Sequence, residues 1–201
     1  MEKWLGEQLL SEDKYIEITY DMIVWDEKTR EWCCHIIQCP NYDKSWACPP
    51  ASPYMEETLK AYSKFWLVVA KHDLRPAVER YKKEHPEWGE RMLYNPRYYN
   101  GTIKKKLRNL IFSFFYKQPN LRYGDALVLW GGGCRVCKNA KHGGCTYPDN
   151  PCRFPGRRQY AMESVGINVH ETAKKVGIEL EWPPRAFVHQ IGLICLKEEG
   201  K

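Results

Sequence analysis

The stretch ALVLWGGGCRVCKNAKHGGCTYPDNPCRFP, residues 126–155, joins a short apolar run to a cysteine-rich loop. Residues 126–130 are apolar throughout, which is typical of a strand buried inside a sheet. Three glycines follow at 131–133, and the loop after them holds four cysteines, Cys134, Cys137, Cys145 and Cys152. Packing does not explain so many thiols in so short and polar a segment. We therefore expect a buried strand that leads directly into a metal site.

The spacing of these cysteines bears on the kind of metal. The first pair has the C-x2-C spacing with which two sulfurs hold one ion, but the run continues as C-x7-C-x6-C. A zinc ribbon usually repeats the first pair. Iron-sulfur clusters also take thiolate ligands and tolerate wider spacing, because a cluster is larger than one ion. The spacing therefore favours an iron-sulfur cluster over zinc.

Two neighbours of these cysteines have more than one interpretation. The glycines would allow a tight turn that brings backbone N–H groups close to the sulfurs, although a plain end of a strand explains them equally well. His142 could replace one sulfur, but in a Lys-His-Gly-Gly loop a solvated side chain is the simpler interpretation.

A second group of cysteines lies near the start of the chain, at Cys33, Cys34, Cys39 and Cys48. Residues 31–37 resemble a strand, on which adjacent side chains point to opposite faces. Cys34 shares a face with Trp32 and Ile36, so we expect Cys34, Cys39 and Cys48 to be the ligands. Cys39 and Cys48 each precede a proline, as does the ferredoxin cysteine that serves a neighbouring cluster, so one of them could serve the Cys134 group. The alternative is a set of buried free cysteines.

The chain resembles a cysteine-rich bacterial and archaeal family described as predicted metal-binding proteins. The resemblance covers about residues 30–182. It rests on Cys34, Cys39, Trp46–Pro53, Gly133–Cys137, Pro151–Pro155 and Ala161–Val169. It implies an iron-sulfur or other metal-binding protein common in anaerobes, without an established reaction. One local difference is the Gly-Gly-Gly run, where the family pattern has Gly-Ala-Gly with a proline before the first cysteine; the cysteines themselves are in place.

Composition indicates a cytoplasmic globular protein with one domain, 1–201, and cysteine-rich segments at 33–50 and 131–156. A chain of 201 residues with 43% hydrophobic content can bury one core without disulfides. Nine cysteines is an odd number, which argues against a secreted disulfide scaffold. The N-terminus has no apolar signal core, and no apolar stretch approaches the ~20 residues that cross a bilayer. The formal charge of +6 falls to roughly +2 if two four-thiolate centres of about −2 each are bound.

The apolar pattern predicts an α/β (α+β) fold, a mixed sheet flanked by helices with a cysteine-rich metal-binding loop. The expected strands are residues 15–25, 31–37, 65–70, 126–130 and 186–196, of which the first two form a hairpin. The expected helices are one capped by Ser52 with Pro53 at its first position, then 74–84 and 102–117, and a last helix capped by Asn168 that ends at Gly177. Cys195 alternates with apolar residues in the last strand and is expected to pack in the core. Both cysteine groups are expected at one edge of the sheet.

The basic residues have two interpretations. Lys104, Lys105, Lys106 and Arg108 could touch nucleic acid or an acidic partner, but a solvated helix face is favoured and nucleic acid is not expected. Arg153, Arg157 and Arg158 lie beside the cysteine loop, where they could offset the charge of a cluster and dock an acidic redox protein, or simply be solvated.

No catalytic triad, phosphate loop or dinucleotide motif is present, so whether the chain is an enzyme stays open. The leading hypothesis is a redox protein with one or two iron-sulfur clusters, 4Fe-4S in type, which transfers electrons to a protein partner or assists a larger oxidoreductase. The first alternative is a structural zinc protein that serves as an interaction module. The second is an enzyme whose unidentified small-molecule substrate binds an iron that three cysteines leave open.

Overall fold

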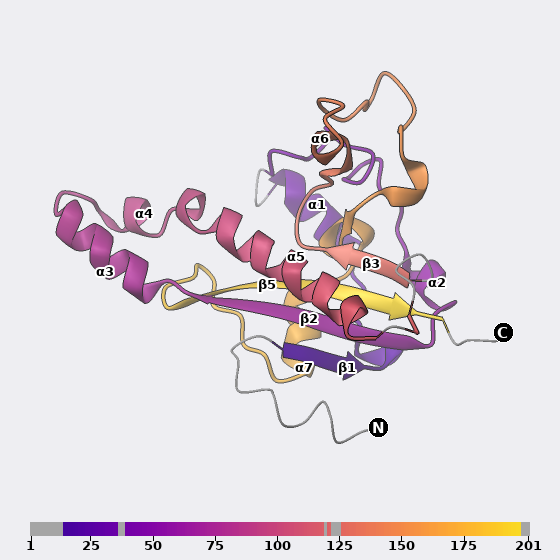
Figure 1. Cartoon of the computed structure of the whole chain (residues 1–201), viewed down its shortest axis with the longest axis horizontal. Helices are drawn as coiled ribbons and strands as arrows, with labels where there is room; N and C mark the ends of the chain where they lie inside the picture. The colour runs from indigo at the N-terminus through magenta and orange to yellow at the C-terminus, as the bar shows by residue number, and fades with distance from the viewer. Residues whose placement is uncertain (1–13, 36–38, 119, 122–125, 198–201) are drawn as a thin grey trace.

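The computed structural model describes residues 14–35, 39–118, 120–121 and 126–197. Its strands are β1 (Lys14–Ile18), β2 (Lys64–Asp73), β3 (Ala126–Trp130), β4 (Tyr160–Ala161) and β5 (Phe187–Leu196). They form one mixed sheet in the order β1-β2-β5-β3-β4 (Figure 1). Neighbouring strands are antiparallel except β3 and β4, which are parallel. The predicted mixed sheet of an α/β fold is confirmed.

The helices flank this sheet and extend from it. They are α1 (Lys28–His35), α2 (Glu56–Leu59), α3 (Arg75–Glu84), α4 (Glu90–Leu93), α5 (Asn100–Tyr116), α6 (Val136–Asn139) and α7 (Val169–Lys175). Short 3-10 turns are η2 (Tyr20–Met22), η3 (Pro96–Tyr98), η5 (Pro155–Arg157) and η6 (Glu163–Val165). In Figure 1, α3 and α4 form an arm at the left end of the sheet. The cysteine loop with α6 lies above β3. No helix in the described ranges combines the length and apolar character required to cross a membrane.

Each face of the sheet buries its own apolar cluster. On one face, α5 buries Ile103, Leu107, Ile111 and Phe114 against β2, β3 and β5. A Cβ at Gly192 would lie 2.9 Å from the backbone oxygen of Leu129 and 3.3 Å from Cδ1 of Ile111. The absence of a side chain at Gly192 therefore lets α5 approach β5 closely. The other face is covered by η6, α7 and the segments around them, including Met162, Ile167 and Ala173.

Most of the strongly periodic segments form the predicted elements. The strands predicted at 65–70, 126–130 and 186–196 correspond to β2, β3 and β5, and the helices at 74–84 and 102–117 correspond to α3 and α5. Asn168 caps α7 as predicted, because its side-chain oxygen accepts a hydrogen bond from the backbone N–H of Glu171 at 3.1 Å. Gly177 follows that helix with φ of +76°, the left-handed conformation expected of a helix stop.

The strand predicted over 15–25 is shorter than expected. It ends at Ile18, and the chain then enters the 3-10 turn η2. Ile18 pairs with Phe65, and the paired strand β2 begins only one residue before Phe65. The edge of β2 therefore offers no hydrogen-bonding partner beyond this point, so the alternating pattern of residues 20–24 does not extend the strand.

The predicted strand at 31–37, and with it the hairpin, is wrong. The described part of this segment belongs to the helix α1, while residues 36–38 lie outside the described residues. The helix begins because a side-chain oxygen of Asp26 accepts a hydrogen bond from the N–H of Lys28 at 3.0 Å, and Thr29 is bound to the Asp26 carbonyl. The capping by Asp26 outweighs the strand preference of Trp32 and of the β-branched residues Ile36 and Ile37.

The helix predicted after Ser52 also begins later, at Glu56. The Ser52 hydroxyl does not cap it but donates a hydrogen bond to the carbonyl of Ser164 at 2.6 Å. The side chain therefore joins two distant segments of the chain.

Cys195 lies in the core, which confirms the prediction. It is fully buried in the cluster that includes Ile191 and Leu193, and burial raises the pKa of its thiol. We expect Cys195→Ala to lower the free energy of unfolding by on the order of 1 kcal/mol, because it leaves a small cavity. Bound metal should stay unchanged. Urea unfolding and metal analysis measure the two effects, and loss of metal in this variant would contradict the assignment.

Candidate metal centre

The cysteine loop leaves the sheet at the end of β3 through the three glycines. Gly132 has φ of +94°, which side chains rarely tolerate. A Cβ at Gly133 would lie 2.9 Å from the side chain of Asn41. Glycine at these two positions therefore allows a sharp turn and a close approach of the loop to the segment after Cys39. Of the two interpretations of the glycines, the tight turn agrees with the φ of Gly132.

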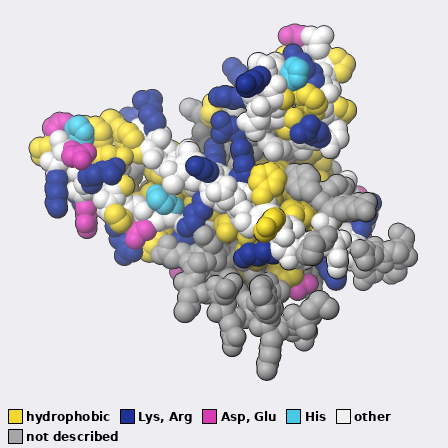
Figure 2. All heavy atoms as spheres, viewed as in Figure 1, with side chains coloured by type: hydrophobic (Ala, Val, Ile, Leu, Met, Phe, Trp, Pro, Cys, Tyr) yellow, Lys and Arg dark blue, Asp and Glu magenta, His cyan; other side chains and the backbone are white. Residues whose placement is uncertain are grey.

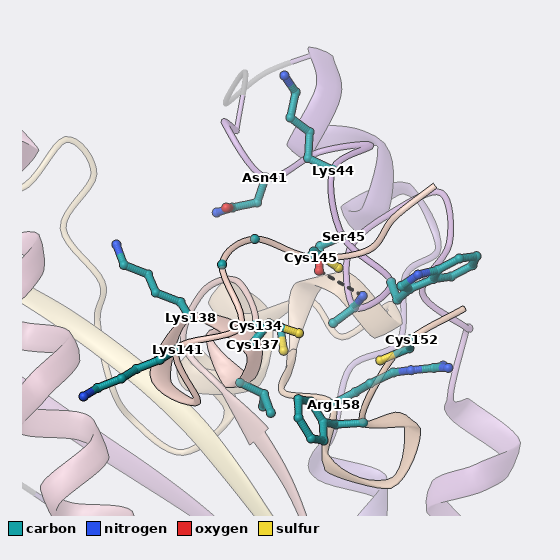
Figure 3. A pocket seen from close by; sticks show the side chains of 16 residues that line it. Asn41, Lys44, Ser45, Cys134, Cys137, Lys138, Lys141, Cys145, Cys152 and Arg158 are labelled. Atoms are coloured by element: carbon teal, nitrogen blue, oxygen red, sulfur yellow. Dashed lines mark hydrogen bonds between the residues drawn. The ribbon is translucent and has the colours of Figure 1, made fainter. Parts of the chain in front are cut away.

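The four cysteines of the loop surround one cavity of about 540 Å³. Figure 3 shows the sulfurs of Cys134 and Cys137 close together, with Cys145 and Cys152 at other sides of the cavity. Cys137 lies in α6, and Cys134 lies just before that helix. The four cysteines of this polar loop therefore line one shared cavity.

The N-terminal cysteine segment completes the wall of this cavity. Asn41, Lys44, Ser45, Trp46 and Ala47 line it together with the loop. Trp46 holds the two segments together, since its indole Nε1 donates a hydrogen bond to the carbonyl of Asn150 at 3.0 Å and its ring packs edge-on against Tyr147 at 5.0 Å between ring centroids. The expectation that the two cysteine groups fold near each other is confirmed.

The thiol of Cys145 is surrounded by hydrogen-bond donors. Partial burial raises its pKa, but hydrogen bonds from the backbone N–H groups of Trp46 and Tyr147 and from the Ser45 hydroxyl outweigh burial, so the net pKa is lowered. Donors aimed at a sulfur stabilise its thiolate, the form that binds metals. The N-terminal segment thus acts directly on a cysteine of the loop.

Arg158 is the arginine that the structure places at the cavity. Hydrogen bonds with Tyr160 and with the thiol of Cys152 raise the pKa of Arg158. Its Nε is buried and has no hydrogen-bond partner among the described residues. Arg153 instead donates to the carbonyl of Gly144 at 3.0 Å, which fixes the loop. Arg158 therefore adds a positive charge to the wall of the cavity, which suits an anionic occupant.

In the N-terminal group, Cys33, Cys39 and Cys48 interact with one another. The backbone N–H of Cys39 donates to the carbonyl of Cys33 at 2.8 Å. Burial raises the pKa of Cys33 to about 11, and Cys39 contributes to the same shift. Burial also raises the pKa of Cys48 to about 12, with contributions from Cys39, Cys33 and Cys134. Cys48 therefore lies between the two cysteine groups.

Cys34 has a different neighbour. Desolvation raises the pKa of Tyr42, and the charge and hydrogen bond of Cys34 raise it further. The preference for Cys34 over Cys33 rested on strand alternation, which does not apply to α1. Adjacent side chains on a helix diverge by about 100° and not by 180°, so both thiols can reach one side of the helix.

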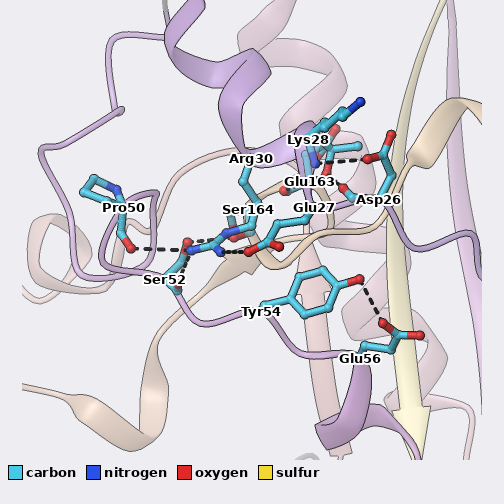
Figure 4. Close-up of polar contacts among 11 residues, drawn as sticks. Asp26, Glu27, Lys28, Arg30, Pro50, Ser52, Tyr54, Glu56, Glu163 and Ser164 are labelled. Carbon is cyan, nitrogen blue, oxygen red and sulfur yellow. Dashed lines mark hydrogen bonds and ion pairs between the residues drawn. The ribbon is translucent and has the colours of Figure 1, made fainter.

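The segment that carries Cys48 is held in place by Arg30, a residue that the sequence analysis did not single out. Figure 4 shows its guanidinium donating to the carbonyl of Ser52 at 2.5 Å and to that of Pro50 at 3.4 Å, while Glu27 pairs with it at 3.5 Å. A charged donor that binds two carbonyls of a loop holds its backbone in place. This network joins α1 to the Cys-Pro-Pro segment.

The cysteine side chains do not converge on a single point. Among the described residues, no three His, Cys, Asp or Glu side chains form a group that could hold one metal ion. His142 packs near Phe154, with 5.6 Å between ring centroids, which agrees with its interpretation as a non-ligand. The thiols of the loop are therefore distributed around a cavity.

These environments predict an order of thiol reactivity in the reduced, metal-free chain. Cys145 is exposed and has a lowered pKa, so iodoacetamide should modify it first, with Cys33 and Cys48 slower and Cys195 last. Peptide mass spectrometry over time measures the order. Ser45→Ala should slow both Cys145 and Cys48 and leave Cys195 unchanged, since the Ser45 hydroxyl lowers the pKa of the first two thiols. Equal rates at Cys145 and Cys48 would show that the described hydrogen bonds do not control the thiolate.

Comparison with known proteins bears on the same residues. Searches of curated proteins and of solved structures returned no match. A family model described as predicted metal-binding protein (DUF2284) matches residues 16–196, a range that includes all nine cysteines. The family description agrees with a chain in which four cysteines line one cavity. The protein therefore belongs to this family of predicted metal-binding proteins.

Proposed function

We propose that the chain is a redox protein that holds a 4Fe-4S cluster on Cys134, Cys137, Cys145 and Cys152. Such a cluster supplies one-electron chemistry when bound. The observation that carries the proposal is that all four thiols of the loop line the same cavity. Electron transfer to a protein partner, or assistance to a larger oxidoreductase, follows from the absence of a catalytic motif in the sequence.

The arrangement of the thiols favours a cluster over a single zinc ion. A structural zinc site brings four ligands to within about 2.0–2.3 Å of one point. Here the sulfurs are spread around a cavity of about 540 Å³ and the spacing lacks a second C-x2-C pair. An iron-sulfur cluster, which is larger than one ion, agrees with both the spread of the sulfurs and the cysteine spacing.

The charges around the cavity also suit a cluster. A four-thiolate 4Fe-4S centre carries about −2 overall. Lys44, Lys138, Lys141 and Arg158 line the cavity. These side chains would balance the charge of the cluster, and the lysines at the rim would attract an acidic redox partner.

The N-terminal cysteines supply a second ligand set. Cys33, Cys39 and Cys48 interact with one another, and Cys34 is next to Cys33 on α1. They would hold a second centre, for which zinc is the alternative. Cys48 also interacts with Cys134 and could replace a ligand of the first centre. The proposal places the chain in the reducing cytoplasm, where free thiolates persist.

An enzyme with an open iron site is the second candidate. A further cavity lies on the other side of Cys134, lined by Gly132 and by Lys104 of α5. This cavity would give a small molecule access to the edge of the centre.

Metal analysis tests the first ligand set. Protein prepared without oxygen should be brown and contain iron with acid-labile sulfide. Cys134→Ala and Cys152→Ala should lose most of the iron and become less soluble, because metal binding contributes to folding. Cys195→Ala is the matched control and should keep its iron. Colourless protein with stoichiometric zinc would exclude the iron-sulfur proposal.

The N-terminal set is tested by comparing adjacent cysteines. Cys33→Ala and Cys48→Ala should each lower the metal content further than Cys34→Ala, since Cys33 and Cys48 interact with Cys39 whereas Cys34 faces Tyr42. Iron, sulfide and zinc per chain are measured for the three variants. Full metal content in Cys48→Ala together with loss in Cys34→Ala would reassign the ligands.

A further inference from the structure

A second cavity adjoins the candidate metal centre and is lined by the glycine run. It has a volume of about 290 Å³. Its walls come from α5, from residues 130–138, and from Asn41 and Gln159. Cys134 belongs to the walls of both cavities. A molecule in the second cavity would therefore lie against the first centre.

The charge of this cavity is one-sided. Its four charged lining residues are cations, Lys104, Arg108, Arg135 and Lys138, and the described residues that line it include no Asp or Glu. Within the described part of the chain, none of these four cations forms a salt bridge. Figure 2 shows Lys and Arg side chains gathered where α5 meets the cysteine loop. Cations that converge without counter-charges repel one another, and an anion relieves this repulsion.

The basic residues of α5 have different environments in the structure. Lys105 is exposed to solvent, and Lys106 donates its Nζ hydrogen to the carbonyl of Lys71 at 2.7 Å. Lys104 and Arg108, four residues apart and on one side of the helix, are partly buried and line the cavity. The expected solvated face therefore holds for Lys105 but not for these two residues.

The glycine run shapes the floor of the cavity. A Cβ at Gly132 would lie 3.2 Å from Cε of Lys104, and the φ of +94° already disfavours a side chain there. A side chain at this position would occupy space between the loop and Lys104. The amide side chains of Asn41 and Gln159 add neutral polar groups to the wall. The recess therefore combines the side chains of Lys104 and Arg108 with two amides and the glycine backbone. These groups are suited to an oxygen-rich anion.

We propose that this recess binds the carboxylate or phosphate group of a small molecule next to the metal centre. Its position beside a metal centre rests on the proposed function, whereas the binding of an oxyanion does not. The concave shape and the partial burial of Lys104 and Arg108 favour a small anion over the surface of an acidic protein, which would contact the exposed Lys105 as well.

Calorimetric titration of the full chain, prepared without oxygen, tests the proposal. The probes are inorganic phosphate and, separately, oxalate, at low ionic strength. Lys104→Gln and Arg108→Gln should each weaken binding of the better probe by about tenfold or more, because each removes a charge-assisted hydrogen bond. Lys105→Gln is the matched control on the same helix and should change the affinity less than twofold. The tighter probe distinguishes a phosphate from a carboxylate ligand.

Three results would overturn the proposal. They are no binding of either probe to the unaltered chain, equal weakening by Lys105→Gln, and tighter binding of polyglutamate that depends on all three side chains, which would indicate acidic-protein docking. Iron and sulfide are measured on the same samples. A full metal content without anion binding would end this inference and leave the proposed function intact. Anion binding that depends on Lys104 in a chain without metal would support the recess and refute the iron-sulfur centre.

Discussion

The pairing of β3 with both of its neighbours fixes the place where the cysteine loop begins and ends. Leu129 is opposite Leu193 of β5 on one side and Tyr160 of β4 on the other, and Trp130 is opposite Ala161. The loop between β3 and β4 is therefore closed by the sheet at both ends, and it contains all four cysteines of the proposed cluster. Since the sheet has already closed this loop, ligands within it lose less conformational entropy when they bind a metal.

The N-terminal cysteines reach the same edge by a different route. Asp26 initiates α1, and Arg30 on that helix binds the carbonyls of Pro50 and Ser52. The segment between them is thereby folded back against the loop, where Trp46 binds the carbonyl of Asn150. These contacts are made by the protein's own side chains and backbone carbonyls, and they hold the two cysteine groups together.

The sequence identified the elements with strong apolar periodicity and the cysteines of the loop, because both signals are local. It failed at α1, where the capping by Asp26 outweighed a strand-like composition, and hence in its reason for choosing between Cys33 and Cys34. It also did not single out Arg30, and it favoured a solvated helix face for Lys104 and Arg108. Their roles depend on which distant segments the fold brings together, and neither spacing nor charge in the sequence contains that information.

Cys134 connects the two cavities physically, and this position has an electrostatic consequence. A cluster on the loop and an oxyanion in the recess would both carry negative charge, in cavities that share Cys134. Lys138 lines both cavities and would be shared between them. An anion that draws Lys138 into the recess would leave the cluster less compensated, which makes the addition of an electron less favourable. Under the two proposals, occupancy of the recess and the reduction potential of the centre are therefore coupled, and by linkage reduction would weaken the binding of the anion.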